Sequence, residues 1–204
     1  MPRSAEPRPA ASRRLRLAAV GLALAAGVAA LATGALRGRL SAALKSPETL
    51  AREAAVALAG ERVLDAGPAR IELDDLRLAE ITVAVDGARA RVVAIAEGGG
   101  RVRFGDQATA LAYVGREAFR LDRCAAGWCA ADGALPALRG VVEALAASPR
   151  PPGARVIAWQ IRVERDAATA GEDQELPAEA SPRRARAVRT LRRDAAGRWT
   201  VVAP

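Results

Sequence analysis

The stretch ITVAVDGARARVVAIAEGGG, residues 81–100, decides the fold of this chain. Its first apolar residues alternate with polar or small ones, which is the two-residue period of a strand with one buried face. Asp86-Gly87 is a strong signal for a two-residue hairpin turn, whose central residues need positive φ. This turn predicts three cross-strand pairs that share one face: Val85 with Ala88, Val83 with Ala90, and Ile81 with Val92.

Further strands are expected after this hairpin. Gly98-Gly99-Gly100 is expected to break the chain, and strands are expected near residues 102–104 and 110–124. The segment VIAWQIRVER, 156–165, predicts a strand with one apolar face. A final hairpin is expected from 185 onward, with a type I turn at Asp194-Ala-Ala-Gly197 and Gly197 in the left-handed region. The apolar face of segment 156–165 consists of Ile157, Trp159, Ile161 and Val163.

Two helices are also expected. Ser46-Pro47-Glu48 has a helix-capping serine, a proline at the first helical position and an acid in the first turn. The helix that follows ends at Gly60 or runs on to Leu64, before Gly67-Pro68 stops it. Pro136 opens the second helix. The expected apolar faces are Leu50, Ala54, Ala57 and Leu58 in the first helix, and Leu138, Val141, Val142 and Leu145 in the second.

These elements predict an α+β domain over residues 47–204. It consists of an antiparallel curved sheet of about six or seven strands packed by two helices, with a mobile acidic loop at 166–182. With 51% hydrophobic but only 3% aromatic residues, its core must be aliphatic. The order of elements is similar to that of cystatin-like and nuclear-transport-factor-2-like domains, some of which are envelope modules on a single anchor. The similarity is one of layout without a shared motif, so it implies no activity.

An internal echo accompanies this order of elements. LDRCAAG, 121–127, aligns without a gap on LRRDAAG, 191–197. Each heptapeptide is expected to end a strand. A repeated turn explains the echo better than a duplicated helix-plus-strands unit, because alanine, arginine and glycine are so common in this chain.

An uncharged segment precedes the domain. Residues 17–36, LAAVGLALAAGVAALATGAL, would span about 30 Å as a helix, which is the hydrocarbon thickness of a bilayer. We interpret this segment as a transmembrane signal anchor between a basic arm, 1–16, and a juxtamembrane linker, 37–46. Two alternatives remain open: a signal peptide cleaved after Ala32, and a buried helix of a globular core, which would normally show a polar stripe.

The charge distribution supports the membrane interpretation. The chain has 31 Lys and Arg against 23 Asp and Glu, a net charge of +8. Residues 1–45 contain eight of the basic residues and one acid, so residues 46–204 carry 23 basic and 22 acidic groups. A nearly neutral domain argues against nucleic-acid binding, which needs a basic surface. The basic arm predicts a cytoplasmic amino end, an inner-membrane location and a periplasmic carboxyl-terminal domain, or a secreted domain if the segment is cleaved.

The two cysteines, Cys124 and Cys129, are expected to form a disulfide. The chain has no histidine, and two thiolates do not complete a zinc site. Their C-x₄-C spacing is not the C-x₂-C of redox-active helix starts. An oxidising compartment would pair them. A four-residue loop would place the two cysteines directly opposite each other, whereas a three-residue loop, as in the echo, would send them to opposite faces; we favour the four-residue loop.

No catalytic, cofactor-binding or metal-binding set is recognisable. The absence of histidine excludes Ser-His-Asp and Cys-His mechanisms. Asp74-Asp75 are adjacent, so in a strand they face opposite ways and are expected to mark a bend. EGGGRVRFG, 97–105, lacks the strand–loop–helix context of a phosphate loop. Arginines alternate between both faces of segment 183–193, which is the pattern of a solvated edge or, alternatively, of a surface that binds anions.

Two functions of different class remain. The first is a membrane-tethered, non-enzymatic envelope domain that binds a protein partner or supports an assembly. The alternative is a small-ligand-binding domain or a histidine-independent enzyme that uses the concave face of the sheet, with Tyr113 or carboxylates as polar groups. A deep pocket with a buried acid would favour the alternative, whereas an aliphatic interior would favour the first function.

Overall fold

The computed structural model describes residues 45–178 and 181–202. The chain divides into two units after Lys45, and the unit from Ser46 onward contains all the described helices and strands. The hypotheses on the arm 1–16 and the segment 17–36 concern residues outside the described ranges. No helix in those ranges is long and apolar enough to cross a membrane.

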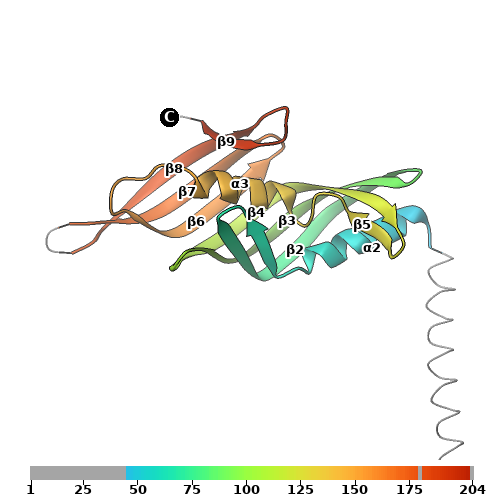
Figure 1. Cartoon of the computed structure of the whole chain (residues 1–204), viewed down its shortest axis with the longest axis horizontal. Helices are drawn as coiled ribbons and strands as arrows, with labels where there is room; N and C mark the ends of the chain where they lie inside the picture. Colours follow the sequence, from blue (N-terminus) through green and yellow to red (C-terminus); the bar gives the residue numbers. More distant parts are fainter. Residues whose placement is uncertain (1–44, 179–180, 203–204) are drawn as a thin grey trace, which may run out of the picture. The chain divides into compact units, whose positions relative to one another are not determined.

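The described unit is α+β, as predicted, with two helices and nine strands (Figure 1). The helices are α2 (Pro47–Ala59) and α3 (Pro136–Ala146). The strands are β1 (Val63–Ala66), β2 (Ala69–Asp86), β3 (Arg89–Phe104), β4 (Gln107–Cys124), β5 (Gly127–Ala130), β6 (Arg155–Glu164), β7 (Ala167–Leu176), β8 (Arg183–Arg193) and β9 (Trp199–Val202).

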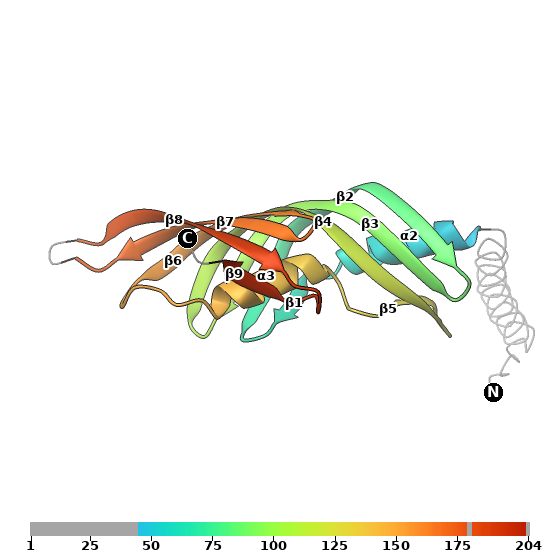
Figure 2. The same ribbon diagram turned by 90° about the horizontal axis from the view of Figure 1, so that it is seen from above.

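All nine strands belong to one curved sheet in the order β1-β2-β3-β4-β6-β7-β8-β9, with β5 paired to β4. Both helices lie on the same face of this sheet (Figure 2). We call this face the inner face and the opposite one the outer face. Mostly aliphatic side chains fill the space between the helices and the inner face, so the expected aliphatic core is confirmed in part. The core also contains the aromatic residues Tyr113, Phe119, Trp128, Trp159 and Trp199.

The first helix is capped as predicted, with the Ser46 hydroxyl accepting from the Thr49 amide at 3.2 Å. It ends at Gly60 and does not reach Leu64, which lies in β1. Its buried face differs from the prediction, because Ala57 is exposed. The residues that the helix buries are Ala51, Ala55 and Ala59, with Leu50, Ala54 and Leu58 beside them.

The second helix buries the predicted stripe of Leu138, Val141, Val142 and Leu145. It connects β4 to β6, and these two strands pair in parallel, with Leu111 opposite Trp159. The expectation of a purely antiparallel sheet is therefore wrong at this one pair. A parallel pair requires a crossover connection rather than a hairpin, and α3 is the helix of that crossover.

The central hairpin forms between β2 and β3, but its predicted register is wrong. The turn uses Gly87 and Ala88, so that Asp86 pairs with Arg89 and Val83 pairs with Val92. Gly87 has a φ of 55°, whereas Asp86 and Ala88 keep negative φ. Only one central residue with positive φ, a glycine in first position, is thus needed. The shift equals two residues, so the predicted side chains still share one face except Ala88, which lies in the turn and is exposed.

β3 runs through Gly98-Gly99-Gly100, which do not break the chain as expected. The opposite strand β2 bulges between Leu73 and Asp75, so Asp74 marks a bend as predicted. A Cβ atom at Gly98 or Gly100 would overlap the backbone of β2. The glycines therefore permit a close approach of two backbones.

The segment expected to be a mobile acidic loop contains strand β7. Its alternate residues Ala168, Ala170, Glu172 and Gln174 are buried on the inner face. The strand was missed because acidic and amide side chains occupy inward positions, which hides the apolar period. This strand and β1, which was also not predicted, raise the number of strands above the predicted six or seven.

In β6, Trp159, Ile161 and Val163 are buried as predicted, but Ile157 is not. A bulge between Val156 and Ala158 interrupts the alternation, and Val156 takes the buried position. An extra residue in one strand reverses the faces of all residues beyond it.

The order of elements repeats along the chain. α2 precedes a meander that ends in β2-β3-β4-β5, and α3 precedes β6-β7-β8-β9. The echoing heptapeptides end β4 and β8, and each is followed by a tryptophan paired with the equivalent arginine: Trp128 with Arg123 and Trp199 with Arg193. The repeat thus covers the whole layout, whereas the sequence favoured a repeated turn alone.

The two echoing turns in fact differ. Cys124 pairs with Gly127 across a two-residue turn. In the predicted final hairpin, the Gly197 amide donates to the Asp194 carbonyl at 2.9 Å, and Gly197 has a φ of 83°. The type I turn with a left-handed glycine is therefore confirmed for the second turn.

Candidate functional site

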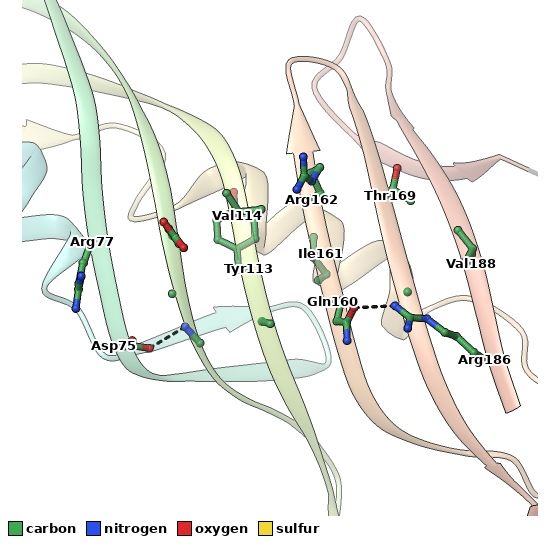
Figure 3. Close-up of a pocket in the computed structure, with 15 residues that line it drawn as sticks. Asp75, Arg77, Tyr113, Val114, Gln160, Ile161, Arg162, Thr169, Arg186 and Val188 are labelled. Atoms are coloured by element: carbon green, nitrogen blue, oxygen red, sulfur yellow. Dashed lines mark hydrogen bonds between the residues drawn. The ribbon is translucent and has the colours of Figure 1, made fainter. Parts of the chain in front are cut away.

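The outer face of the sheet carries a hollow that we call the outer groove. Its volume is about 900 Å³, within the range typical of binding pockets. Figure 3 shows that its side chains come from neighbouring strands on both sides of the parallel β4–β6 pair. Side chains or backbone of Asp75, Arg77, Glu97, Gly98, Gly99, Ala112, Tyr113, Val114, Gln160, Ile161, Arg162, Thr169, Gly171, Arg186 and Val188 line the groove.

Small residues make the floor of the groove low. Gly99, Ala112 and Gly171 lie on β3, β4 and β7, where larger side chains would fill the hollow. Asp75, beside the bulge of β2, accepts a hydrogen bond from the Gly99 amide at 2.9 Å and fixes one end of the groove (Figure 3). The glycine run read from the sequence as a loop thus forms part of this surface.

Charged and polar side chains surround this floor. Arg186 donates to the side-chain oxygen of Gln160 at 2.7 Å and lies 3.8 Å from a carboxylate oxygen of Asp173 (Figure 3). Arg77 and Arg162 lie on opposite sides of the groove. Val188 is the most exposed large apolar side chain of the described residues, with 67% of its surface accessible. The groove therefore offers both ionic and apolar contacts.

Tyr113 does not present its hydroxyl to this groove. The phenol is buried and donates a hydrogen bond to Glu117 at 2.6 Å. Burial, reinforced by the Glu117 carboxylate, raises the pKa of Tyr113 well above its usual value. To reach Glu117, the ring of Tyr113 lies over Gly115, where a Cβ atom would overlap it.

Glu117 is fully buried and caps α3 from the neighbouring strand. Its carboxylate accepts from the amides of Ala137 and Leu138 at 2.8 and 2.9 Å. This capping is needed because Leu135, in the N-cap position, has no side-chain acceptor. Burial raises the pKa of Glu117, although the hydrogen bonds from Tyr113 and from the two amides oppose this effect.

A second buried carboxylate, Glu172, belongs to the other end of α3. It accepts from Trp159, Gln174 and Arg189 at 3.0, 2.9 and 2.8 Å. Arg150 lies 3.5 Å away, and it also donates to the Leu145 carbonyl at the end of α3. Burial acts to raise the pKa of Glu172, but the hydrogen bonds from Arg189 and Trp159 and the charges of Arg189 and Arg150 lower it overall.

Both buried acids are bonded to groups at the ends of α3 or to side chains that contact it. Each carboxylate is saturated by donors that come from the protein itself, and each helps to hold α3 on the inner face. The described residues contain no group of three or more Cys, Asp or Glu side chains that could hold a metal ion. The sequence could not single out Glu117 or Glu172, because both lie among many exposed acids of the same type.

Cys124 and Cys129 form the predicted disulfide. The predicted four-residue loop is wrong, because the turn has two residues, Ala125 and Ala126, and Cys129 pairs with Asp122. The two cysteines are therefore diagonal neighbours on one face, with Cα atoms 6.0 Å apart, within the range that a disulfide can bridge. Gly127, opposite Cys124, has a φ of 119°, a backbone conformation that glycine adopts more readily than other residues.

The arginines of segment 183–193 lie on β8 and alternate between the two faces, as predicted. Arg184, Arg186 and Arg192 occupy the outer face, and Arg189 points inward to Glu172. Only residues Thr190–Arg193 of β8 pair with β9. No strand of the described residues pairs with this edge of β8 at 183–189.

Comparison of the chain with protein-family models, with curated proteins and with solved structures finds no significant match.

Proposed function

We propose that this chain is a membrane-tethered, extracytoplasmic, non-enzymatic domain that binds a protein partner, and that the outer groove belongs to its binding surface. One observation carries the proposal: only one of the two faces of the sheet is covered by helices. Both helices and a filled aliphatic core cover the inner face, whereas the outer face is uncovered in the described residues and contains a hollow of about 900 Å³.

The form of the groove supports a protein rather than a small molecule as the ligand. Its lining comes from six strands, β2 to β4 and β6 to β8, so it extends across the sheet. A small ligand on such a surface would remain exposed on one side, whereas binding pockets bury most of their ligand. The polar and charged side chains around the groove are consistent with the polar rim of a protein-binding surface.

The tandem layout supports a scaffold role. A helix followed by a run of antiparallel strands occurs twice, with β1 as an additional strand in the first half. Two such halves joined through the parallel β4–β6 pair form one continuous sheet with a broad outer face. This layout supports binding and assembly, and it supplies no catalytic group.

The alternative, a ligand site or a histidine-independent enzyme on the inner face, has less support. Tyr113, the polar group expected to serve it, is buried and hydrogen-bonded to Glu117, which in turn caps α3. A substrate would have to displace that helix before it reached them.

Photo-crosslinking in cells that naturally produce the chain tests this proposal. A photoreactive amino acid at Val114, in the groove, should give a discrete protein adduct, whereas the same group at the exposed Val56 of α2 should not. The substitution Ala112→Arg fills the floor of the groove and should abolish the Val114 adduct. An adduct that persists in Ala112→Arg, or no adduct from Val114, would refute the groove as a binding surface.

A further inference from the structure

The free edge of β8 has an internal counterpart in the first half of the chain. The echo aligns Leu121 of β4 with Leu191 of β8, and each strand ends in a hairpin with a short strand, β5 or β9. Upstream of β5, the same edge of β4 is filled by β6, which pairs in parallel with residues 110–115. Upstream of β9, the corresponding edge of β8 has no strand beside it in the described residues.

An unpaired edge exposes backbone donors and acceptors that a further strand can satisfy. The free part of β8, residues 183–189, is as long as the strands that protein partners usually add. Its exposed Val188 offers an apolar contact, at 67% accessibility, at the point where the edge meets the outer groove. The edge is therefore suitable for strand addition.

The charge of this edge selects the partner. Arg183 and Arg184 are exposed, and neither has a carboxylate within salt-bridge distance among the described residues. Arginines at an edge disfavour neutral and basic strands, which is a common protection against aggregation. An acidic strand would instead place its carboxylates beside these guanidinium groups.

A second copy of this chain meets like charges at this edge when two β8 strands pair about Arg186. Two β8 edges related by a two-fold axis would pair antiparallel, for example with Arg186 opposite Arg186 and Arg183 opposite Arg189. Like charges directly opposite each other destabilise a strand pair. Self-pairing in this register is therefore disfavoured, whereas pairing with an acidic strand is favoured.

We propose that the free edge of β8, residues 183–189, binds an extended acidic segment of another protein, which adds as a strand parallel to β8 in the place that β6 takes beside β4. This proposal rests on the proposed function and names the chemistry of the partner. The added strand would continue the sheet, and its outward side chains would lie next to Arg186 and Val188 at the end of the outer groove.

The probe for this proposal is a fluorescent seven-residue peptide of alternating glutamate and valine, with blocked ends, added to the full chain in detergent micelles. It should bind, and its affinity should fall with added salt. The matched peptide with lysine in place of glutamate should bind at least tenfold more weakly. Equal binding of the two peptides would overturn the acidic preference.

Paired charge reversals locate the binding. Arg183→Glu with Arg184→Glu, on the free edge, should weaken peptide binding at least tenfold. Arg89→Glu with Arg91→Glu makes the same change in net charge on β3, which is paired on both sides, and should weaken it less than threefold. Equal losses of peptide affinity in the two variants would indicate a general effect of charge and would refute binding at the β8 edge.

Two measurements separate strand addition from charge attraction. With peptide bound, amide hydrogens within 183–189 should exchange at least tenfold more slowly. Two further peptides are compared, one N-methylated at its valine amides and one at its glutamate amides, and one of these two should no longer bind. A nitroxide at the amino end of the peptide should broaden the amide signals of Arg183 and Arg184 rather than that of Arg189. Unchanged exchange would refute strand addition, and broadening at Arg189 alone would refute the parallel orientation.

These outcomes are distinct from those of the crosslinking test. If the Val114 adduct forms but the peptide fails, the domain binds its partner without strand addition and this inference is wrong. If the peptide binds as described but no Val114 adduct forms, the proposed binding at the β8 edge is supported and the proposed role of the groove is wrong.

Discussion

At the scale of single residues, two buried carboxylates hold α3 against the sheet. Glu117 caps its amino end from β4, and Glu172 holds Arg150, which in turn contacts its carboxyl end. Such groups are costly to bury without partners, so substituting them should reveal how much the helix depends on them.

Replacing Glu117 should destabilise the domain. Glu117→Ala leaves two helix amides and the Tyr113 hydroxyl without their acceptor, at a cost of about 3 kcal/mol in the free energy of unfolding. Urea denaturation followed by circular dichroism measures this. Glu97→Ala, on an exposed residue of the outer face, is the control and should change stability by about 0.5 kcal/mol or less. Equal losses in the two variants would contradict the capping role.

Glu172 should make stability dependent on pH in the acidic range. Its pKa in the folded protein is lowered, so the carboxylate stabilises the fold above the unfolded pKa of about 4.3, and this contribution is lost as the pH falls through the folded pKa. The difference in unfolding free energy between the wild type and Glu172→Gln should therefore shrink on acidification from neutral pH to below about pH 4.

Glu117→Gln is the matched comparison in the same titration. The pKa of Glu117 is raised, so this carboxyl keeps its proton up to a higher pH in the folded state than in the unfolded state. Its contribution falls as the pH rises between the two pKa values, which is the opposite slope. Identical slopes for the two variants would show that the two carboxylates are not distinguished by their surroundings.

At the scale of elements, each half of the sheet ends in a short strand, and the two short strands are held in place by different interactions. The Cys124–Cys129 disulfide fastens β5 to β4, while a turn with a left-handed glycine and an Asp194 cap connects β8 to β9. Asp194 aligns with Cys124 in the echo, so the same position carries a covalent link in one half and a hydrogen-bonding side chain in the other.

Removing the disulfide should cost little. Cys124→Ser together with Cys129→Ser opens a ring of only six residues, for which the chain-entropy estimate is about 2 kcal/mol. The fold should persist, as judged by circular dichroism, with a lower midpoint of urea denaturation. Intact mass after alkylation of the folded, unreduced wild type is the direct check, and uptake of two labels would mean that the thiols are free.

At the scale of the whole molecule, the compartment of the domain is the property on which the proposed function depends most. The expectation derives from residues 1–45, which combine an uncharged run with eight basic residues and one acid. The disulfide is consistent with an oxidising compartment.

Fusion of alkaline phosphatase to the carboxyl terminus should give an active enzyme, because this enzyme folds only where its own disulfides form. A parallel fusion to a chain that lacks residues 1–36 should be expressed but inactive. Carbonate extraction should leave the full-length chain with the membranes if residues 17–36 are an anchor. An expressed but inactive full-length fusion would refute the extracytoplasmic location.

The sequence alone determined the properties that depend on neighbours along the chain. The capping of α2 by Ser46, the buried stripe of α3, the turn at Asp194–Gly197 and the pairing of the two cysteines all follow from short-range spacing, because helix periods, turn glycines and small rings are local. The α+β class and the curved sheet with two helices followed from the order of these elements. The aliphatic core followed from composition.

Only the tertiary structure decided what depends on contacts between distant segments. The shifted hairpin register, the bulges beside Asp74 and Ile157 and the passage of β3 through three glycines reflect the fit of one backbone against another. Strand β7 is held by the inward Glu172, whose ionic partners come from a loop and from β8. The parallel β4–β6 pair exists because α3 crosses between them, and the edge of β8 is free because β9 pairs only with residues 190–193. Register, pairing direction and the saturation of buried charge are set by neighbours that lie far away in the sequence.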